Sequence, residues 1–369
     1  MSESYTLRYP RRVLVRSSAR LGLRVLMRLL TRTTVTGQEN LPKTGPVILV
    51  GNHSALAEVL MMATYVPWQV EILGVGDIPI EPMFAPFAHA FGFIPVNRGS
   101  MDRRAMQMAL DVLAQKGAVG IFPEGGVWEP GIKRAHSGVA WLSSKANAPL
   151  IPIGFGGLGG ALGAAFALKR PRLWMHIGQM IAPIQENIAG KTRKQALLDG
   201  AAAVMSRVEA LIPPHEKVNR IYDEQFALLV EVEDAHGQPV PMPDHLRIHQ
   251  PEALAKFFHR PVLLRTLGYN LRLPVKALQQ IPAQTDAARL ADAAQVVLDY
   301  VKTNDTYFTY RFGETEGQAM EAGVMQLRDL ARWAASEGYS LRVIPIRRYR
   351  QTEDGEEIVE PRVMTKHKL

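Results

Sequence analysis

The chain has 369 residues and no cysteine. The lack of cysteine excludes a disulfide framework, a thiolate nucleophile, a zinc ribbon and a cysteine-ligated iron–sulfur site. No G-x-S-x-G sequence occurs either, so the serine elbow of an α/β-hydrolase is not expected. The composition, 47% hydrophobic and 21% charged, is that of a globular protein. The length predicts two domains.

An uninterrupted apolar stretch suited to a membrane span is not evident. The one uncharged run of sufficient length covers residues 148–168, but it contains two prolines and six glycines. A strand followed by a glycine-rich loop is the better prediction for this run. Near the start of the chain, charges recur too often for a spanning helix, which needs about 20 largely apolar residues.

Positive charge is concentrated at the start of the chain, where the first 34 residues carry eight arginines and one glutamate. The arginine stripe consists of Arg8, Arg12, Arg16, Arg20, Arg24, Arg28 and Arg32. On a helix this spacing gives a line of charge that drifts slowly round the axis beside a wide apolar face. We interpret residues 1–34 as a membrane-associating helix, with Arg12, Arg16, Arg20, Arg24 and Arg28 reaching lipid phosphates. The alternative is an amphipathic helix packed on its own domain with a solvated basic face.

Short apolar runs alternate with helical patterns as far as residue 211. The predicted strands are 46–51, 70–74, 118–122, 149–155 and 173–177, and the main predicted helices are 102–116 and 191–211. This alternation predicts an α/β fold, with a mainly parallel sheet flanked by helices, over residues 35–216. Pro213-Pro214 marks the boundary to a smaller α+β domain, residues 217–369. Its predicted strands are 226–232, 306–312, 341–347 and 358–363, and its predicted helices are 251–258, 287–302 and 318–337.

A histidine and an acid follow the first predicted strand, as His53 and Glu58. An imidazole held in one tautomer by a carboxylate is a base that can take a proton from a hydroxyl. Residues five apart lie about 140° apart on a helix, so the pair meets only if His53 precedes the helix. Ser54 is a plausible helix cap that permits this.

Three later segments add polar residues at the ends of predicted strands. Arg98 follows an apolar stretch, and an arginine fork matches phosphate oxygens in a bidentate manner. Glu124 lies at the carboxyl end of a buried strand, where open α/β sheets bind their ligands. Pro149 and Pro152 flank a third apolar segment.

The order of these segments resembles the glycerophospholipid acyltransferase family, which includes 1-acylglycerol-3-phosphate acyltransferases. The matching segments are Asn52-His53 with Glu58, the stretch ending at Arg98, Phe122–Gly125, and Pro149–Pro152. The resemblance spans roughly residues 35–190. Two positions depart from the family pattern: Glu58 stands where aspartate is usual, and Gly126 replaces the usual threonine.

The resemblance implies a role for each matching residue. His53 would be the general base and Glu58 its acidic partner. Substrate would be bound by Asn52, Arg98, Glu124, Gly125, Gly126 and Pro152. Transfer would be direct from acyl-CoA or acyl-carrier protein as co-substrate, with no metal and no other cofactor. The expected partners are a membrane lipid surface, a lysophospholipid acceptor and the acyl-thioester donor. The expected location is the cytoplasmic face of a membrane, as a peripheral or monotopic protein, and the sequence leaves the oligomeric state open.

Competing interpretations remain. The acceptor could instead be a glycolipid or aminolipid, or the chain could be a catalytically weak membrane-binding protein that keeps the fold. A nucleic-acid-binding role rests only on the basic start, where Val and Leu rather than aromatic residues fill the gaps. We therefore expect no nucleic acid partner. A dinucleotide site at 154–159 lacks the acid expected about twenty residues later, and His245 with His249 lacks a third metal ligand.

Overall fold

The computed structural model describes residues 6–53, 56–98, 102–124, 136–213, 222–281, 285–351 and 353–361. The chain divides into two compact units, Met1–Val218 and Asn219–Leu369. The predicted boundary near residue 216 is close to this division, although it lies outside the described residues. The predicted basic helix is part of the first unit. None of the helices in the described ranges has the length and apolar character needed to cross a membrane.

The first unit is built on a seven-stranded sheet with the order β1-β7-β6-β2-β5-β3-β4. All neighbouring pairs are parallel except β6 and β7, which are antiparallel. The predicted α/β fold with a mainly parallel sheet is therefore confirmed. The strands are β1 (Arg32–Thr36), β2 (Val47–Gly51), β3 (Val70–Val75), β4 (Ile94–Val96), β5 (Ala118–Ile121), β6 (Leu150–Gly156) and β7 (Arg172–Ile177).

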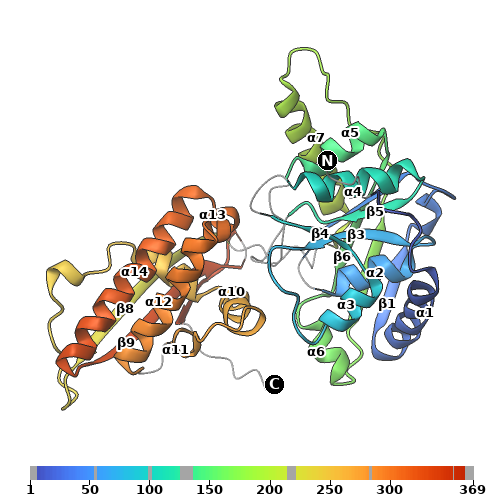
Figure 1. Ribbon diagram of the computed structural model, residues 1–369. Coiled ribbons are helices and arrows are strands. Elements are labelled where there is room, and N and C mark those ends of the chain that lie inside the picture. The colour runs from blue at the N-terminus through green and yellow to red at the C-terminus, as the bar shows by residue number, and fades with distance from the viewer. Residues whose placement is uncertain are drawn as a thin grey trace. The chain divides into compact units, whose positions relative to one another are not determined.

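Helices cover both faces of this sheet (Figure 1). They are α1 (Val13–Leu30), α2 (Ala57–Tyr65), α3 (Ala85–Phe91), α4 (Arg103–Ala114), α5 (Gly138–Ala146), α6 (Ala161–Phe166) and α7 (Arg193–Leu211). One core cluster joins β2 and β5 to α4, α5 and α7, and a second joins the opposite side of the sheet to α2 and α3. The central strands are buried along their whole length, as expected for a parallel sheet covered on both sides.

Local sequence signals explain where the helices of the first unit begin. Asp102 caps α4 by accepting a hydrogen bond from the backbone N–H of Ala105, and Thr192 caps α7 in the same way. The predicted cap Ser54 lies outside the described residues. The stretch after β6, predicted as a loop, contains the short helix α6.

The second unit is an α+β assembly built on a three-stranded antiparallel sheet, β10-β9-β8. Its strands are β8 (Tyr222–Glu233), β9 (Ser340–Arg350) and β10 (Glu357–Pro361). Its helices are α9 (Pro251–Phe258), α10 (Pro261–Arg265), α11 (Lys276–Gln279), α12 (Ala287–Thr303), α13 (Thr306–Phe312) and α14 (Glu314–Glu337). One prediction is wrong here, because residues 306–312 form a helix rather than a strand.

Candidate active site

The candidate site is built at one edge of the seven-stranded sheet, where β2 and β5 end. These strands are parallel neighbours, with Val50 opposite Ile121. His53 and Glu124 each come three residues later in their own segment, so they leave the sheet side by side. The backbone N–H of His53 donates a hydrogen bond of 3.1 Å to Glu124 Oε1. The structure thus joins two of the predicted residues directly.

The His53 ring lies between an aromatic face and a buried carboxylate. It stacks on Phe122, with ring centroids 4.6 Å apart and planes at 27°. Its Nδ1 lies 3.9 Å from Oε1 of Glu58, whose side chain is fully buried in the first turn of α2. His53 precedes this helix, as the spacing of the pair requires. The predicted partnership is therefore geometrically available.

The exposed part of the imidazole is not its Nδ1 edge. Nδ1 is buried and has no hydrogen-bond partner among the described residues. The side chain as a whole retains 18% exposure, so the rest of the ring, which includes Nε2, provides the accessible surface. The 3.9 Å separation exceeds hydrogen-bond length. Such contacts commonly tighten only when substrate binds. This geometry suits a base whose Nε2 meets substrate while Nδ1 is turned toward Glu58.

Asn52 is committed to holding the strand ends together. Its side-chain amide donates to the carbonyl of Phe155 at 3.2 Å, and its oxygen accepts from the N–H of Phe155 at 2.8 Å. These two bonds fix the end of β2 to β6 where their ladder finishes. The structure therefore supports a positioning role for Asn52, and its predicted contact with substrate stays a prediction.

The wall behind His53 depends on a glycine in β2. A Cβ added to Gly51 would lie 2.6 Å from the ring of Phe155 and 3.1 Å from that of Phe122. Only glycine lets both rings approach the strand this closely. The rings of Phe122 and Phe155 therefore pack behind His53 and hold its side chain in place. This role of Gly51 was not predicted from the sequence.

Arg98 forms a bidentate ion pair that was not foreseen. Its Nε and Nη2 donate to the two carboxylate oxygens of Asp77 at 2.7 and 3.1 Å. Strands β3 and β4 pair with Val75 opposite Val96, so Asp77 and Arg98 follow the strands at matching positions. Asp77 therefore holds the guanidinium fork at the same edge of the sheet as His53, and a bound phosphate would compete with it for the fork.

The remaining predicted substrate-binding residues are placed differently. Glu124 is 6% exposed and orients the backbone of His53. Pro152 and Gly154 share one face of β6, and the Cβ position of Gly154 meets Leu211 of α7. Phe155 belongs to the core on the other face. The structure therefore does not bring Pro152 toward the His53 ring. Gly125 and Gly126 lie outside the described residues.

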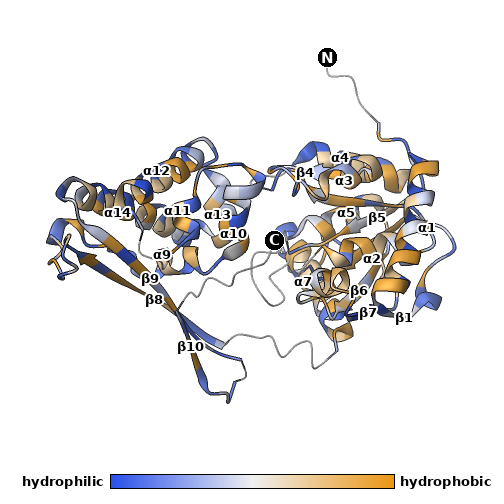
Figure 2. Ribbon diagram, turned by 90° about the horizontal axis from the view of Figure 1, so that it is seen from below, coloured by the Kyte–Doolittle hydropathy of each residue, from blue (hydrophilic) through white to orange (hydrophobic). Residues whose placement is uncertain are grey.

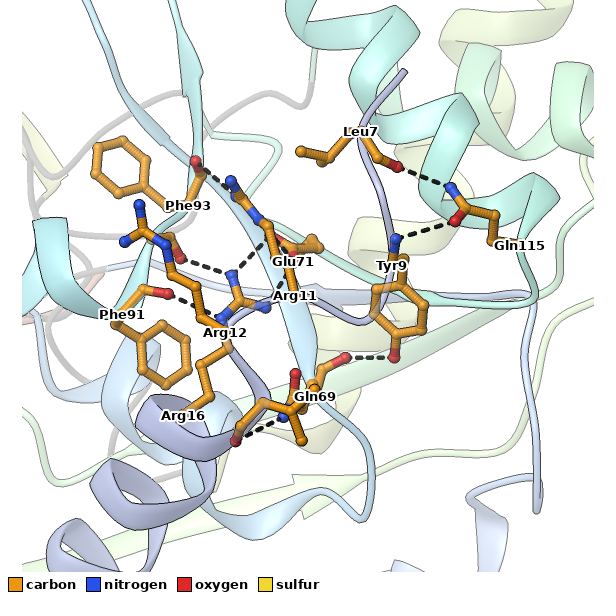
Figure 3. A network of polar contacts seen from close by, with 12 residues as sticks. Leu7, Tyr9, Arg11, Arg12, Arg16, Gln69, Glu71, Phe91, Phe93 and Gln115 are labelled. Atoms are coloured by element: carbon orange, nitrogen blue, oxygen red, sulfur yellow. Dashed lines mark hydrogen bonds and ion pairs between the residues drawn. The ribbon is translucent and has the colours of Figure 1, made fainter. Parts of the chain in front are cut away.

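The side chains of Arg11, Arg12 and Arg16 make polar contacts with the rest of the first unit (Figure 3). Arg16 is fully buried and pairs with Glu71 of β3 through two contacts, of 2.5 and 2.9 Å. Arg11 donates to the same carboxylate at 2.8 Å. Backbone carbonyls accept from the other stripe members: His89 and Ala90 from Arg12, Val66 from Arg20, and Thr64 from Arg24.

These contacts correct the prediction for Arg16, which cannot reach lipid phosphates because it is fully buried. Arg16 has no exposed surface. Arg12, Arg20 and Arg24 donate hydrogen bonds to backbone carbonyls of the neighbouring helices and loops. A regular helix turns about 100° per residue, so each fourth residue is displaced by about 40°. The stripe arginines therefore differ in environment: Arg16 is buried, Arg20 and Arg24 are half-buried, and Arg12 and Arg28 are exposed. Arg12 and Arg28 are the two of the five that are exposed, and Arg12 also donates to the carbonyls of His89 and Ala90.

The outward face of α1 is apolar instead. Leu14 is 84% exposed, Leu21 65% and Leu29 64%, and Val25 and Leu26 are about half exposed. Figure 2 shows apolar residues recurring along this helix. A single exposed leucine is ordinary, but a row of them along one helix marks a surface suited to an apolar partner.

Comparison with known proteins finds similarity between the part of the chain that carries the site and a family of acyltransferases. The acyltransferase family model matches residues 32–156. A 1-acyl-sn-glycerol-3-phosphate acyltransferase of Borreliella burgdorferi is 30% identical over 122 residues, which are 32% of this chain and 49% of that protein. The chain thus spans about half of that relative's length. One of Bacillus subtilis is 21% identical over 191 residues, covering 52% of this chain and 93% of that protein.

A solved structure is also similar to this chain. It is the 1-acyl-sn-glycerophosphate (LPA) acyltransferase PlsC from Thermotoga maritima, with 16% identity and a TM-score of 0.39. The match covers 55% of this chain and 84% of that one. Residues 219–369 lie outside the family match.

Proposed function

We propose that this chain, whose residues 32–156 match the acyltransferase family model, transfers a fatty-acyl group to the hydroxyl of lysophosphatidate or a related phospholipid precursor. The observation that carries the proposal is the setting of His53. Its ring is stacked on Phe122, its Nδ1 is turned toward the buried Glu58, and the remainder of the ring is accessible. The acyl donor would be acyl-CoA or acyl-carrier protein.

The arrangement supports a direct transfer. Nε2 of His53 takes the proton of the acceptor hydroxyl as its oxygen attacks the thioester carbonyl carbon. The C–S bond then breaks, and the imidazolium returns the proton to the departing thiolate. Glu58, buried beside Nδ1, stabilises the imidazolium while it exists. The new bond is an ester, the products are a diacyl lipid and a free thiol, and no acyl-enzyme forms.

Arg98 is proposed to bind the acceptor phosphate. Its fork is already oriented by Asp77 at the sheet edge that carries His53, which lowers the entropic cost of binding an anion. The incoming phosphate would replace Asp77 as the acceptor of some or all of the guanidinium hydrogen bonds of Arg98. Asp77 would then act as a positioning residue that holds the arginine between turnovers.

Replacing Arg98 with alanine is expected to raise the acceptor KM by roughly tenfold to a hundredfold, because hydrogen bonds to a charged group are lost. The donor KM should change little. Steady-state kinetics with each substrate varied in turn provide the measurement, and Arg104→Ala is a matched control because Arg104 is an exposed arginine on α4. A larger rise in the donor KM than in the acceptor KM would refute the phosphate-binding role.

A membrane surface is the proposed place of action. The exposed leucines and valines of α1 would enter the lipid interface, and the buried arginines would hold the helix to the domain beneath. The protein would then be peripheral or monotopic, at the cytoplasmic face. The proposal keeps the predicted lipid partner and assigns the contact to the apolar face of α1, with Arg16 held inside the domain.

The proposed acceptor class is tested by competition. Labelled acyl-thioester is supplied together with equal amounts of lysophosphatidate and a neutral glycolipid that bears a free hydroxyl. Label should enter the phosphate-bearing lipid preferentially. Preferential labelling of the glycolipid would instead support a neutral acceptor. The observation that favours this second candidate is the ion pair of Arg98 with Asp77, because Asp77 neutralises the charge of the arginine.

A further inference from the structure

A basic groove lies on the first unit beside the edge strand β1. It has a volume of about 690 Å³ and is lined by parts of α1, β1 and α2. Four arginines contribute to its lining, Arg24, Arg28, Arg32 and Arg170, and no acidic side chain does so among the described residues. Three threonines also line it: Thr31 donates to the carbonyl of Met27 at 2.6 Å and pairs with Thr33 at 2.7 Å, and Thr34 is exposed. The lining chemistry is that of an anion site.

The arginines of this groove are held without neutralising their charge. Arg24 donates to the carbonyl of Thr64 at 2.8 Å, and Arg170 donates to that of Arg28 at 3.1 Å. Arg28 and Arg32 are exposed. Carbonyl oxygens orient a guanidinium but carry no formal charge, so the positive charges of the groove remain available to an anion.

Positive charges that lie close together near this groove repel one another unless an anion binds beside them. Arg32 lies directly opposite Arg172 in the ladder of β1 and β7, a destabilising arrangement for two cations. Burial lowers the pKa of Arg20, and the charge of Arg24 on the same helix lowers it further. A bound phosphate ester would remove this repulsion.

The groove is separate from the proposed acceptor site. Arg98 follows β4, which is one edge strand of the sheet, whereas Arg32 begins β1, the opposite edge strand. The whole width of the sheet lies between them. An anion in this groove therefore does not occupy the position proposed for the acceptor phosphate.

The groove also adjoins the exposed apolar face of α1. Leu21 and Arg28 are seven residues apart and lie within about 20° of each other round the helix axis. Leu29 and Val25, which are 64% and 51% exposed, complete the last turns. A ligand that fits both features has an anionic head joined to apolar chains.

We infer that this groove binds the phosphate headgroup of an anionic membrane lipid, whose acyl chains contact the apolar face of α1. This inference rests on the membrane-surface action proposed above. It adds a headgroup preference that is set by Arg28, Arg32 and Arg170 and does not depend on the active site. A soluble phosphate or an acidic protein would satisfy the charge but leave the adjoining leucines uncovered.

The test measures vesicle binding of the full chain by co-sedimentation, with no acyl donor present. Vesicles of phosphatidylcholine alone are compared with vesicles that also contain phosphatidylglycerol. The variant is R28Q/R32Q, which leaves the hydrogen bonds of Arg24 and Arg170 in place. The control is R207Q/R348Q, which removes the same charge from two arginines exposed on α7 and β9. Thermal melting confirms that each variant is folded.

Wild type is expected to bind the anionic vesicles about tenfold more tightly than the neutral ones, and R28Q/R32Q to lose about that factor on anionic vesicles only. The control should lose less than about threefold. Equal losses in both variants, or equal wild-type binding to both vesicle types, would overturn the headgroup site while leaving membrane association intact. Failure of wild type to bind either vesicle would overturn both proposals.

Three further titrations test whether the groove binds a ligand other than a lipid headgroup. The same variants are titrated with coenzyme A, with inorganic phosphate and with acyl-carrier protein. A loss of affinity in R28Q/R32Q for one of these, with vesicle binding unchanged, would assign the groove to a soluble phosphate or to an acidic protein and would overturn the lipid assignment. Unchanged affinity for all three, with reduced binding to anionic vesicles, supports it.

Discussion

Replacing His53 with alanine is expected to lower kcat about a thousandfold, because a positioned general base typically contributes factors of 10² to 10⁴. The substitution removes the ring that is proposed as the base, whereas the backbone N–H can bond to Glu124 in either variant. Binding of donor and acceptor should change little. The measurement is steady-state transfer of labelled acyl groups, with kcat and both KM values determined.

The matched control for this variant is His245→Ala, which removes an exposed imidazole from the second unit. Its kcat should equal that of wild type. Circular dichroism and thermal melting would show that H53A is folded, although the ring of Phe122 loses its stacking partner. A folded H53A variant that retains more than about a tenth of wild-type kcat would contradict the assignment of His53 as base.

The second large effect is expected from Glu71→Gln. Glu71 is fully buried and is the carboxylate shared by Arg11 and Arg16, and Arg16 is itself fully buried. Removing one partner of a buried ion pair leaves an uncompensated charge and typically costs about 3–5 kcal/mol. We expect the free energy of unfolding of the first unit to fall by about that amount. Urea unfolding followed by tryptophan fluorescence would measure it.

Glu186→Gln is the control for Glu71→Gln, because Glu186 pairs with Arg193 at the surface rather than in the core. Exposed pairs contribute little to stability, so this variant should unfold near the wild-type midpoint. A Glu71→Gln variant that is no less stable than Glu186→Gln would show that the Arg11–Glu71–Arg16 cluster does not fix α1 to the domain.

The same cluster predicts a dependence of stability on pH. Burial alone would raise the pKa of Glu71, but the hydrogen bonds and charges of Arg16 and Arg11 outweigh it and hold the pKa below its ordinary value of 4.5. A group with a lowered folded-state pKa stabilises the fold above its unfolded pKa and ceases to do so as the pH falls through the folded value. The stability difference between wild type and Glu71→Gln should therefore be constant near neutral pH and shrink below about pH 4.5.

The first unit could largely be predicted because its central strands are short, continuous apolar runs. Such runs, separated by helical patterns, have few alternatives to a covered parallel sheet. The edge strand β1 was missed because its sequence, Arg-Thr-Thr-Val-Thr, is polar and half exposed. Its only signal was the run of β-branched residues.

The error at residues 306–312 has a different cause. Thr306, Tyr307 and Phe308 have high strand propensity, but tertiary packing overrides it. Tyr307 and Phe308 are buried in α13, and a Cβ at Gly317 of α14 would meet the Thr309 backbone at 2.7 Å. Helix α14 can approach this closely only because it presents a glycine, and single-sequence propensity contains no such information.

The sequence indicates several residues of the candidate site, but it does not indicate most of the contacts that hold them. The spacing of His53 and Glu58 predicts their meeting, which the structure permits at 3.9 Å. Asp77 stands in no motif, and only the parallel register of β3 and β4 brings it to Arg98. Similarly, periodicity gives α1 a charged and an apolar face but does not say which is buried. Glu71, one acid within an apolar strand, decides that.

The most direct test of the account follows a labelled acyl group from thioester to lipid. Purified protein is incubated with labelled acyl-CoA, or in parallel with labelled acyl-carrier protein, and lysophosphatidate on anionic vesicles. The account predicts labelled diacyl product, release of one thiol per ester formed, and no label on the protein after denaturation. Free labelled fatty acid in place of diacyl lipid, or thioester left intact with every phosphate-bearing acceptor, would contradict it.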